Sequence, residues 1–264
     1  MPRGFLTKCA VLLALPAAMG WADEWNKKFP LTGRADLRVD FNDGSVSIKS
    51  WDRHEIEARV STEGWKIGPG EVRVIDRQTG DRVEIDLRVP HRQWDFFVGK
   101  QRIHADIWVP RELRGDIHTG DGRISVQNLK GEIRLSSGDG RIDADSMDGN
   151  LEATTGDGRI RVSGRWDQLN LRSGDGSIEA DVQRNSKVVS GWRIHTGDGH
   201  ITLRLPDTLA ADLDVHTGDG KVNVDLPAQV QGTMRNSDFR AKLNGGGSSL
   251  VVRTNDGTIR VERL

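Results

Sequence analysis

The chain has 264 residues, in which 38 basic and 39 acidic side chains nearly cancel to a formal net charge of −1. This balance argues against a nucleic-acid-binding protein, which would carry a basic excess. With 31 glycines and 35% hydrophobic residues, the composition favours turns and strands over helices.

Residues 1–22 have the pattern of an export signal. Arg3 and Lys8 form a basic start, residues 9–19 are apolar, and small residues lead up to a cleavage point after Ala22. A membrane span needs about 20 apolar residues, and no later stretch of this sequence approaches that length. The sequence therefore predicts a signal peptide and a mature chain in the periplasm or outside the cell. Cys9 is the only cysteine and lies in the signal, so disulfides are not expected in the mature chain.

After a short segment at 23–30, we expect a single domain over residues 31–264, with a less regular N-terminal part at 31–115. In that part, residues 37–41, 83–89 and 103–109 alternate between apolar and polar side chains, which is typical of strands with one buried face. Residues 94–100 are predicted to form a loop or hairpin. We expect this part to cap the first open sheet edges of the regular part, because open edges invite aggregation.

The regular part, residues 116–264, is built on a Gly-Asp-Gly triplet. Four copies follow one another at an even spacing of about 18 residues, and the next two come after longer intervals. The first longer interval indicates an insertion near residues 183–188, and residues 236–238 are predicted to be a degenerate copy. The predicted turn residues are Gly120, Asp121, Gly122, Gly138, Asp139, Gly140, Gly156, Asp157, Gly158, Gly174, Asp175, Gly176, Gly197, Asp198, Gly199, Gly218, Asp219 and Gly220.

Each triplet is followed by an alternating strand, and a second turn comes halfway through the repeat, at Gly131, Gly149 and Gly164 and at Pro206 and Pro227. The two strands of a single repeat cannot fold alone, so equivalent strands of successive repeats must pair in parallel. The sequence predicts an all-β, right-handed β-solenoid resembling a parallel β-helix, with two sheets and about 18 residues per coil. We expect the triplet glycines to supply positive φ angles, and the aspartates to form Asx turns.

These residues also resemble a known family. Residues 107–113, the repeated Thr/Ser-Gly-Asp-Gly turns and residues 254–261 are together similar to the bacterial putative adhesin family, whose function is uncharacterised. The resemblance covers most of the mature chain. It implies a β-helical fold and a location in the cell envelope, and it supplies no catalytic residues.

Metal binding is the sharpest alternative to a purely structural role for the repeats. Stacked corner aspartates would stand about 5 Å apart, although Arg123, Arg141 and Arg159 can neutralise them. The register of calcium-binding nonapeptides fails, because it places an aspartate where this sequence has Ile124. His195 and His216 are predicted to be neighbours on an outward column. We expect no metal site and no cofactor; the weak metal candidates are Asp121, Asp139, Asp157, Asp175, His195 and His216.

The sequence has no metalloprotease helix, nucleophile elbow or phosphate-binding loop. We therefore expect a non-enzymatic, adhesin-like binding or scaffold module whose partner is an envelope protein or a polysaccharide. Two alternatives remain open: a β-helix protein that binds or cleaves polysaccharide, and a calcium-stabilised repeat protein. Tryptophans in the N-terminal part can either stack on sugars or cap the core; they are Trp51, Trp65, Trp94 and Trp108.

Overall fold

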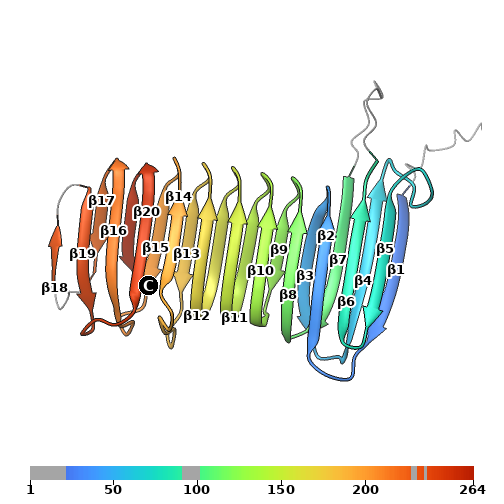
Figure 1. The fold of residues 1–264 in the computed structure, drawn as a ribbon, viewed down its shortest axis with the longest axis horizontal. Helices are drawn as coiled ribbons and strands as arrows, with labels where there is room; N and C mark the ends of the chain where they lie inside the picture. Colours follow the sequence, from blue (N-terminus) through green and yellow to red (C-terminus); the bar gives the residue numbers. More distant parts are fainter. Residues whose placement is uncertain (1–21, 91–101, 227–230, 235–236) are drawn as a thin grey trace, which may run out of the picture.

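The computed structural model describes residues 22–90, 102–226, 231–234 and 237–264. Within these ranges all the regular secondary structure is β-strand and there is no helix, so the all-β prediction is confirmed. The 21 strands belong to one large mixed sheet, and they stand side by side along the long axis of the molecule (Figure 1). The prediction of two separate sheets is wrong, because two long strands run through the second turn and join both halves of the repeat. No helix that could cross a bilayer is found in this part of the chain. Residues 1–21 of the predicted signal peptide, the loop at 94–100 and Pro227 lie outside the described residues, whereas Ala22, the last residue of the predicted peptide, begins a described strand.

In chain order the strands are β1 (Ala22–Pro30), β2 (Ala35–Phe41), β3 (Ser45–Trp51), β4 (Glu55–Glu63), β5 (Arg73–Thr79), β6 (Arg82–Arg88), β7 (Arg102–Pro110), β8 (Glu112–Thr119), β9 (Ile124–Gln127), β10 (Lys130–Ser137), β11 (Ile142–Thr155), β12 (Ile160–Ser173), β13 (Ile178–Val182), β14 (Trp192–Thr196), β15 (Ile201–Leu205), β16 (Ala211–Asp219), β17 (Val222–Asp225), β18 (Gln231–Met234), β19 (Asp238–Leu243), β20 (Ser249–Asp256) and β21 (Ile259–Arg263). Residues 23–30, expected only as a short leading segment, thus belong to β1, which pairs with β4.

In the regular part, strands one repeat apart pair in parallel. Ile133 of β10 lies beside Leu151 of β11, and Leu151 lies beside Leu169 of β12, so each partner is the equivalent residue of the next repeat. These pairs belong to a first series of strands, which in spatial order is β6, β2, β8, β10, β11, β12, β14, β20 and β16. A second series is β7, β3, β9, β11, β12, β13, β15, β21 and β17. The long strands β11 and β12 contribute to both series.

One hydrophobic core runs through the sheet. Alternate residues are buried in almost every strand of both series; in β13, for example, Ile178, Ala180 and Val182 are at most 1% exposed. Because the sheet curves, both series turn their apolar sides toward the same core. Each fully buried aliphatic side chain contributes about 1.5–3 kcal/mol, and the alternate residues carry their polar groups outward.

The C-terminal repeats are not stacked in sequence order. The last pair of strands, β20 and β21, lies between β14 and β16 and between β15 and β17 (Figure 1). The expectation that each repeat pairs with the next one in the chain is therefore wrong here. The predicted degenerate repeat at 236–238 is also wrong: Asn236 lies outside the described residues, and β19, from Asp238, runs antiparallel to β16 and covers its free edge.

The N-terminal end is interleaved in the same way. β2 lies between β6 and β8, and β3 lies between β7 and β9, so the first repeat in the sequence is the second in space. Beyond them, the antiparallel strands β4 and β1 extend one series, and β5 extends the other. The predicted insertion is confirmed: β13 ends at Val182, β14 begins at Trp192, and the pairing of Leu171 with Ile194 spans more of the chain than one regular repeat.

The glycines of the triplets are required for close approach of backbones, and the prediction of positive φ is wrong for them. None of the twelve triplet glycines has a φ in the left-handed region. A Cβ on Gly158 would instead lie 2.0 Å from the carbonyl oxygen of Gly140, and one on Gly140 would lie 2.0 Å from that of Gly122. Only glycine lets the corners stack this closely. Positive φ occurs at the second turn, where Gly131 has φ 131°.

A column of buried hydroxyl groups connects the corners, and sequence reasoning gave it no role. The Ser or Thr before each triplet donates a hydrogen bond to the last glycine carbonyl of the spatially neighbouring corner, for instance Thr155 Oγ1 to Gly140 O at 2.9 Å. The order of these bonds repeats the interleaving. The donor and acceptor pairs are Thr119–Gly44, Ser137–Gly122, Thr155–Gly140, Ser173–Gly158, Thr196–Gly176, Thr254–Gly199 and Thr217–Gly257.

Candidate functional site

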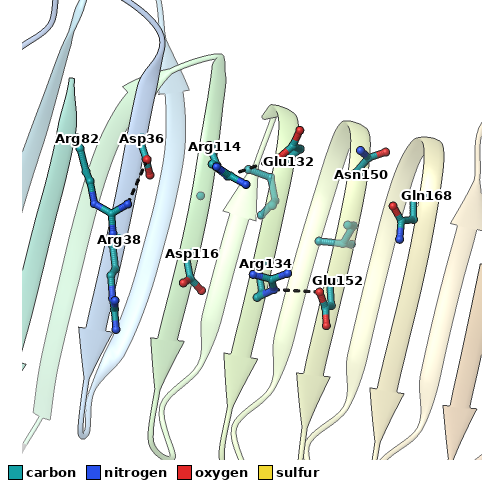
Figure 2. Close-up of a pocket in the computed structure, with 13 residues that line it drawn as sticks. Asp36, Arg38, Arg82, Arg114, Asp116, Glu132, Arg134, Asn150, Glu152 and Gln168 are labelled. Atoms are coloured by element: carbon teal, nitrogen blue, oxygen red, sulfur yellow. Dashed lines mark hydrogen bonds and ion pairs between the residues drawn. The ribbon is translucent and has the colours of Figure 1, made fainter. Parts of the chain in front are cut away.

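A shallow groove of about 310 Å³ lies on the first series of strands (Figure 2). The alternation that buries apolar residues of β2, β6, β8, β10, β11 and β12 points their polar neighbours outward. The groove is lined by Asp36, Arg38, Arg82, Arg114, Gly115, Asp116, Glu132, Ile133, Arg134, Asn150, Leu151, Glu152 and Gln168. Its four arginines and four carboxylates balance in charge.

The register arranges these charges in rows of alternating sign. Arg114 of β8 lies between Asp36 of β2 and Glu132 of β10. In the next row, Arg134 lies between Asp116 and Glu152. Opposite charges on neighbouring strands stabilise a sheet: Arg134 Nε is 2.9 Å from a Glu152 carboxylate oxygen, and Arg114 Nε is 3.5 Å from one of Glu132. The hydrogen bond to Glu152 raises the pKa of Arg134 above its ordinary value.

Two amides complete the row of Arg114. Asn150 follows Glu132 in register, and Gln168 follows Asn150. Neither amide makes a hydrogen bond to another residue that the structure describes, and Figure 2 shows both at the end of the row. The groove therefore offers paired charges and two uncommitted amides, which can donate to and accept from a ligand rich in hydroxyl groups.

The groove carboxylates do not have the surroundings of a general acid. The side chains of Glu132 and Glu152 are 52% and 49% exposed, and each is paired with an arginine. A carboxyl that stays protonated near neutral pH needs an apolar, desolvated site.

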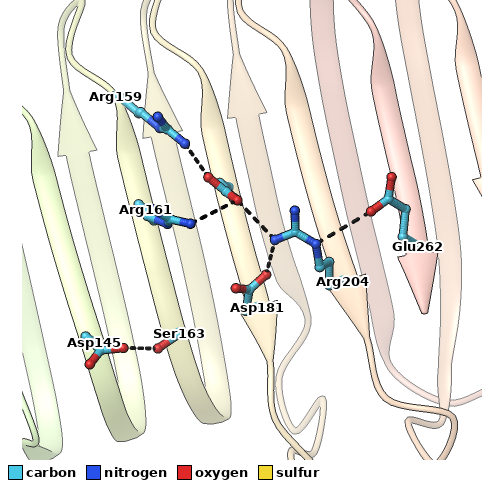
Figure 3. A network of polar contacts seen from close by, with 8 residues as sticks. Asp145, Arg159, Arg161, Ser163, Asp181, Arg204 and Glu262 are labelled. Atoms are coloured by element: carbon cyan, nitrogen blue, oxygen red, sulfur yellow. Dashed lines mark hydrogen bonds and ion pairs between the residues drawn. The ribbon is translucent and has the colours of Figure 1, made fainter. Parts of the chain in front are cut away.

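A network of ion pairs crosses the second series of strands (Figure 3). Glu179, with a side chain only 14% exposed, contacts Arg159, Arg161 at 3.4 Å and Arg204 at 3.0 Å. Arg204 also bonds Asp181 at 2.6 Å and lies 3.5 Å from Glu262. Burial by itself would raise the pKa of Glu179, but hydrogen bonds from Arg204 and Arg159 outweigh it and lower that pKa. The network links β12, β13, β15 and β21, which indicates a structural role.

The corner aspartates Asp121, Asp139, Asp157 and Asp175 are exposed. Two of the three arginines expected to neutralise them pair elsewhere: Arg123 is 3.9 Å from Asp143, and Arg159 contacts Glu179. Across the described ranges, no group of three or more His, Cys, Asp or Glu side chains is arranged to hold a metal ion.

The two histidines predicted to be neighbours are separated by an inserted strand. His195 of β14 lies beside Arg253 of β20, and Arg253 lies beside His216 of β16. His216 Nδ1 is 2.8 Å from Asp238 Oδ1. The predicted adjacency of His195 and His216 is wrong, because β20 places a cation between them.

The N-terminal tryptophans divide into two kinds. Trp65 is 8% exposed and belongs to the core, so of the two roles left open by the sequence it has the one in the core. Trp51 and Trp108 stack on each other with ring centroids 6.4 Å apart. The guanidinium groups of Arg53 and Arg59 lie 4.7 and 5.7 Å from these two rings. Both indoles are half-buried and already in contact with ring and cation neighbours, and Trp94 lies outside the described residues.

Sequence reasoning did not locate the groove, although a signal was present. The pairs Arg114 and Glu132, and Arg134 and Glu152, are residues of opposite charge that occupy equivalent positions in successive repeats. Once the period is known, such pairs indicate side chains that lie beside each other on neighbouring strands.

A family comparison covers the same repeats. The family model described as Toastrack DUF4097 matches residues 112–193 and 164–262, which together make up more than half of the chain. The chain belongs to this family. The predicted resemblance to bacterial adhesin-like proteins is thereby confirmed.

Three of the solved structures similar to this toastrack protein have adhesin or cell-adhesion names. A putative adhesin from Parabacteroides distasonis ATCC 8503 has 10% identity and a TM-score of 0.51, over 90% of this chain and 96% of that one. A putative adhesin from Bacteroides fragilis NCTC 9343 has 13% identity and a TM-score of 0.47, over 93% and 98%. A putative cell adhesion protein from Clostridium sporogenes ATCC 15579 has 11% identity and a TM-score of 0.45, over 92% and 100%. None of these is named as an enzyme, and no curated protein matches the chain.

Proposed function

We propose that this toastrack protein is a non-enzymatic binding module of the cell envelope that holds a neutral polysaccharide in the groove on its first series of strands. One observation carries the proposal: the groove contains equal numbers of arginines and carboxylates, and beside them are two amides without a hydrogen bond to any described residue. Basic and acidic side chains alternate along the groove, so a charged polymer of either sign would be repelled by about half of them. The hydroxyl groups of a neutral polysaccharide can hydrogen-bond to arginines and to carboxylates alike.

The scaffold that we infer for this function is a β-solenoid in which residues 31–264 form one domain together with the preceding strand β1. It is supported by the parallel register, which shifts by one repeat from strand to strand, and by the two series of strands around one core. A solenoid presents long, regular outer faces, which suit an extended polymer. The export signal that the sequence predicts at residues 1–22 supports placement in the periplasm or outside the cell.

The test is affinity electrophoresis through gels that contain purified neutral or acidic bacterial exopolysaccharides. Asn150→Ala combined with Gln168→Ala should abolish retardation by a neutral polymer, because both amides face the groove. The matched control is Gln127→Ala combined with Asn223→Ala, which removes two exposed amides from the second series. Equal retardation of both double variants would reject the groove. If the unaltered protein releases new reducing ends from the polysaccharide, the protein is an enzyme that cleaves the polymer, and the proposal of a non-enzymatic binding module is wrong.

A further inference from the structure

Outside the groove, the outer face of β12 and β14 carries a group of basic side chains that make no polar contact with another described residue. Arg172 lies beside His195, and Asn170 lies beside Arg193, so the four side chains form a square on two neighbouring strands. Arg172 and Arg193 are both exposed, and neither forms a hydrogen bond or ion pair with any residue in the described ranges.

The carboxylates around this square are already engaged. Glu152, beside Asn170, is bonded to Arg134 at 2.9 Å. On the far side, Asp214 of β16 is bonded to Arg253 at 2.6 Å and lies 3.3 Å from Arg240. The square therefore has an uncompensated positive charge, in contrast to the balanced groove. Within it, Asn170 Oδ1 is buried and has no hydrogen-bond partner in the part of the chain that the structure describes.

We propose that Arg172, Arg193 and His195 bind a phosphate group. Neighbouring strands stand about 4.8 Å apart and alternate residues of one strand about 6.7 Å apart, so the two long arginine side chains and the imidazole can converge on one anion. A phosphate monoester has three strong acceptor oxygens, one for each of these donors. Arginine is the residue whose planar fork fits phosphate oxygens.

The surroundings of His195 give the site a built-in reporter. Burial, and then the positive charge of Arg172, lower the pKa of His195 below its ordinary value. The charged groups that face it are Arg172 from β12, Arg253 from β20 and Arg193 on its own strand. A bound phosphate dianion reverses the local charge and favours the imidazolium form. Occupation of the site should therefore raise the pKa of His195.

The experiment is an NMR titration of the purified chain with inorganic phosphate at constant ionic strength, followed on the His195 ring. We expect saturable binding with an upward shift of the His195 titration. Arg172→Gln and Arg193→Gln should each weaken binding at least tenfold. Arg260→Gln is the matched control, because Arg260 is an exposed arginine on β21 and its loss changes the net charge equally. Equal weakening by the control, or a phosphate-independent His195 titration, would overturn the proposal.

Vesicles distinguish the two sources of a phosphate group. Phosphatidylcholine vesicles with and without phosphatidate are sedimented with the chain. Phosphatidate-dependent sedimentation that Arg193→Gln abolishes assigns a lipid headgroup, and phosphate binding without sedimentation assigns a soluble phosphate. Absence of both kinds of binding rejects the site and leaves the groove proposal untouched, because the polysaccharide test uses other residues.

Discussion

At the scale of single residues, the corners are held by two features of the Thr/Ser-Gly-Asp-Gly sequence. The glycines leave room for the carbonyl oxygen of the next corner, and the preceding hydroxyl donates to it. Both features act between neighbouring repeats, so each corner is stabilised only when its neighbour is in place. The same four residues thus specify the turn and its stacking.

Replacement of Gly158 by alanine tests the steric role of the glycines. A Cβ there would lie 2.0 Å from Gly140 O, and overpacking of this severity should lower the free energy of unfolding by about 3 kcal/mol or more. Urea denaturation measures this loss of unfolding free energy. Gly68→Ala is the control, since a Cβ at Gly68 meets no atom within 4 Å. A Gly158→Ala chain as stable as the control would contradict the close-approach explanation.

The hydroxyl column is tested by Thr155→Val, which keeps the shape of the side chain. The change removes the hydrogen bonds to Gly138 O and Gly140 O and should cost about 1–3 kcal/mol of unfolding free energy. Thr154→Val, one residue earlier and on the outer face, removes a hydroxyl with no hydrogen-bond partner among the described residues. Denaturation curves that shift equally for the two variants would rule out a stabilising column.

At the scale of strands, the cross-strand ion pairs should contribute most to the stability of the fold where they are buried. The groove pairs are about half exposed and should contribute little, whereas Glu179 is 14% exposed and contacts three arginines. Exposed pairs contribute roughly 0–1 kcal/mol, and loss of a partner from a buried pair leaves charges uncompensated. The second series is therefore the more sensitive to charge removal.

Glu179→Gln should lower the free energy of unfolding at pH 7 by about 1.5–3 kcal/mol, the range for a hydrogen-bonded charge. The pKa of Glu179 is lowered in the folded chain, so its stabilisation is present above the ordinary value of 4.5 and is lost as pH falls through the lowered pKa. Thermal melts across this pH range should show that the difference in melting temperature between the variant and the parent protein becomes smaller as the pH is lowered. Glu132→Gln, at a half-exposed pair, should change stability by less than about 1 kcal/mol.

At the scale of the whole molecule, the two ends of the stack have the same arrangement of strands. At each end the terminal repeat of the sequence lies one place inside the stack, and an antiparallel strand covers the neighbouring edge in the first series. Unpaired edges invite fraying and aggregation. Interleaving ties both chain ends into the sheet, because β20 and β2 each have partners on both sides.

Engineered disulfides test the interleaving. Neighbouring strands stand about 4.8 Å apart, which suits the Cα separation of a disulfide. With Cys9 replaced, His195→Cys and Arg253→Cys should cross-link readily, because these positions lie side by side. His195→Cys and His216→Cys lie two strands apart, beyond the reach of a disulfide. Non-reducing electrophoresis distinguishes the cross-linked from the uncross-linked chains. Efficient formation of the second cross-link would show that the repeats are stacked in sequence order and that the interleaved order is wrong.

The sequence by itself determined the local structure of the regular part. Burial alternates residue by residue, and the corner triplet recurs at an even interval, so strands such as β10 and β13 and their inward residues follow from patterns within a few residues. The regular register also follows, because consecutive repeats are joined by short turns that leave them adjacent.

Only the tertiary structure decided which repeats are neighbours at the ends. Repeats with similar edges can pair in more than one order, and nothing in the spacing of Asp198, Asp219 and Asp256 distinguishes sequence order from insertion of β20 and β21. The choice depends on longer connections and on antiparallel strands such as β19, which occupy the edges that a next repeat would use. The separation of His195 from His216 is a consequence of contacts between distant segments. So is the position of Arg172 and Arg193, which pair with no carboxylate among the described residues.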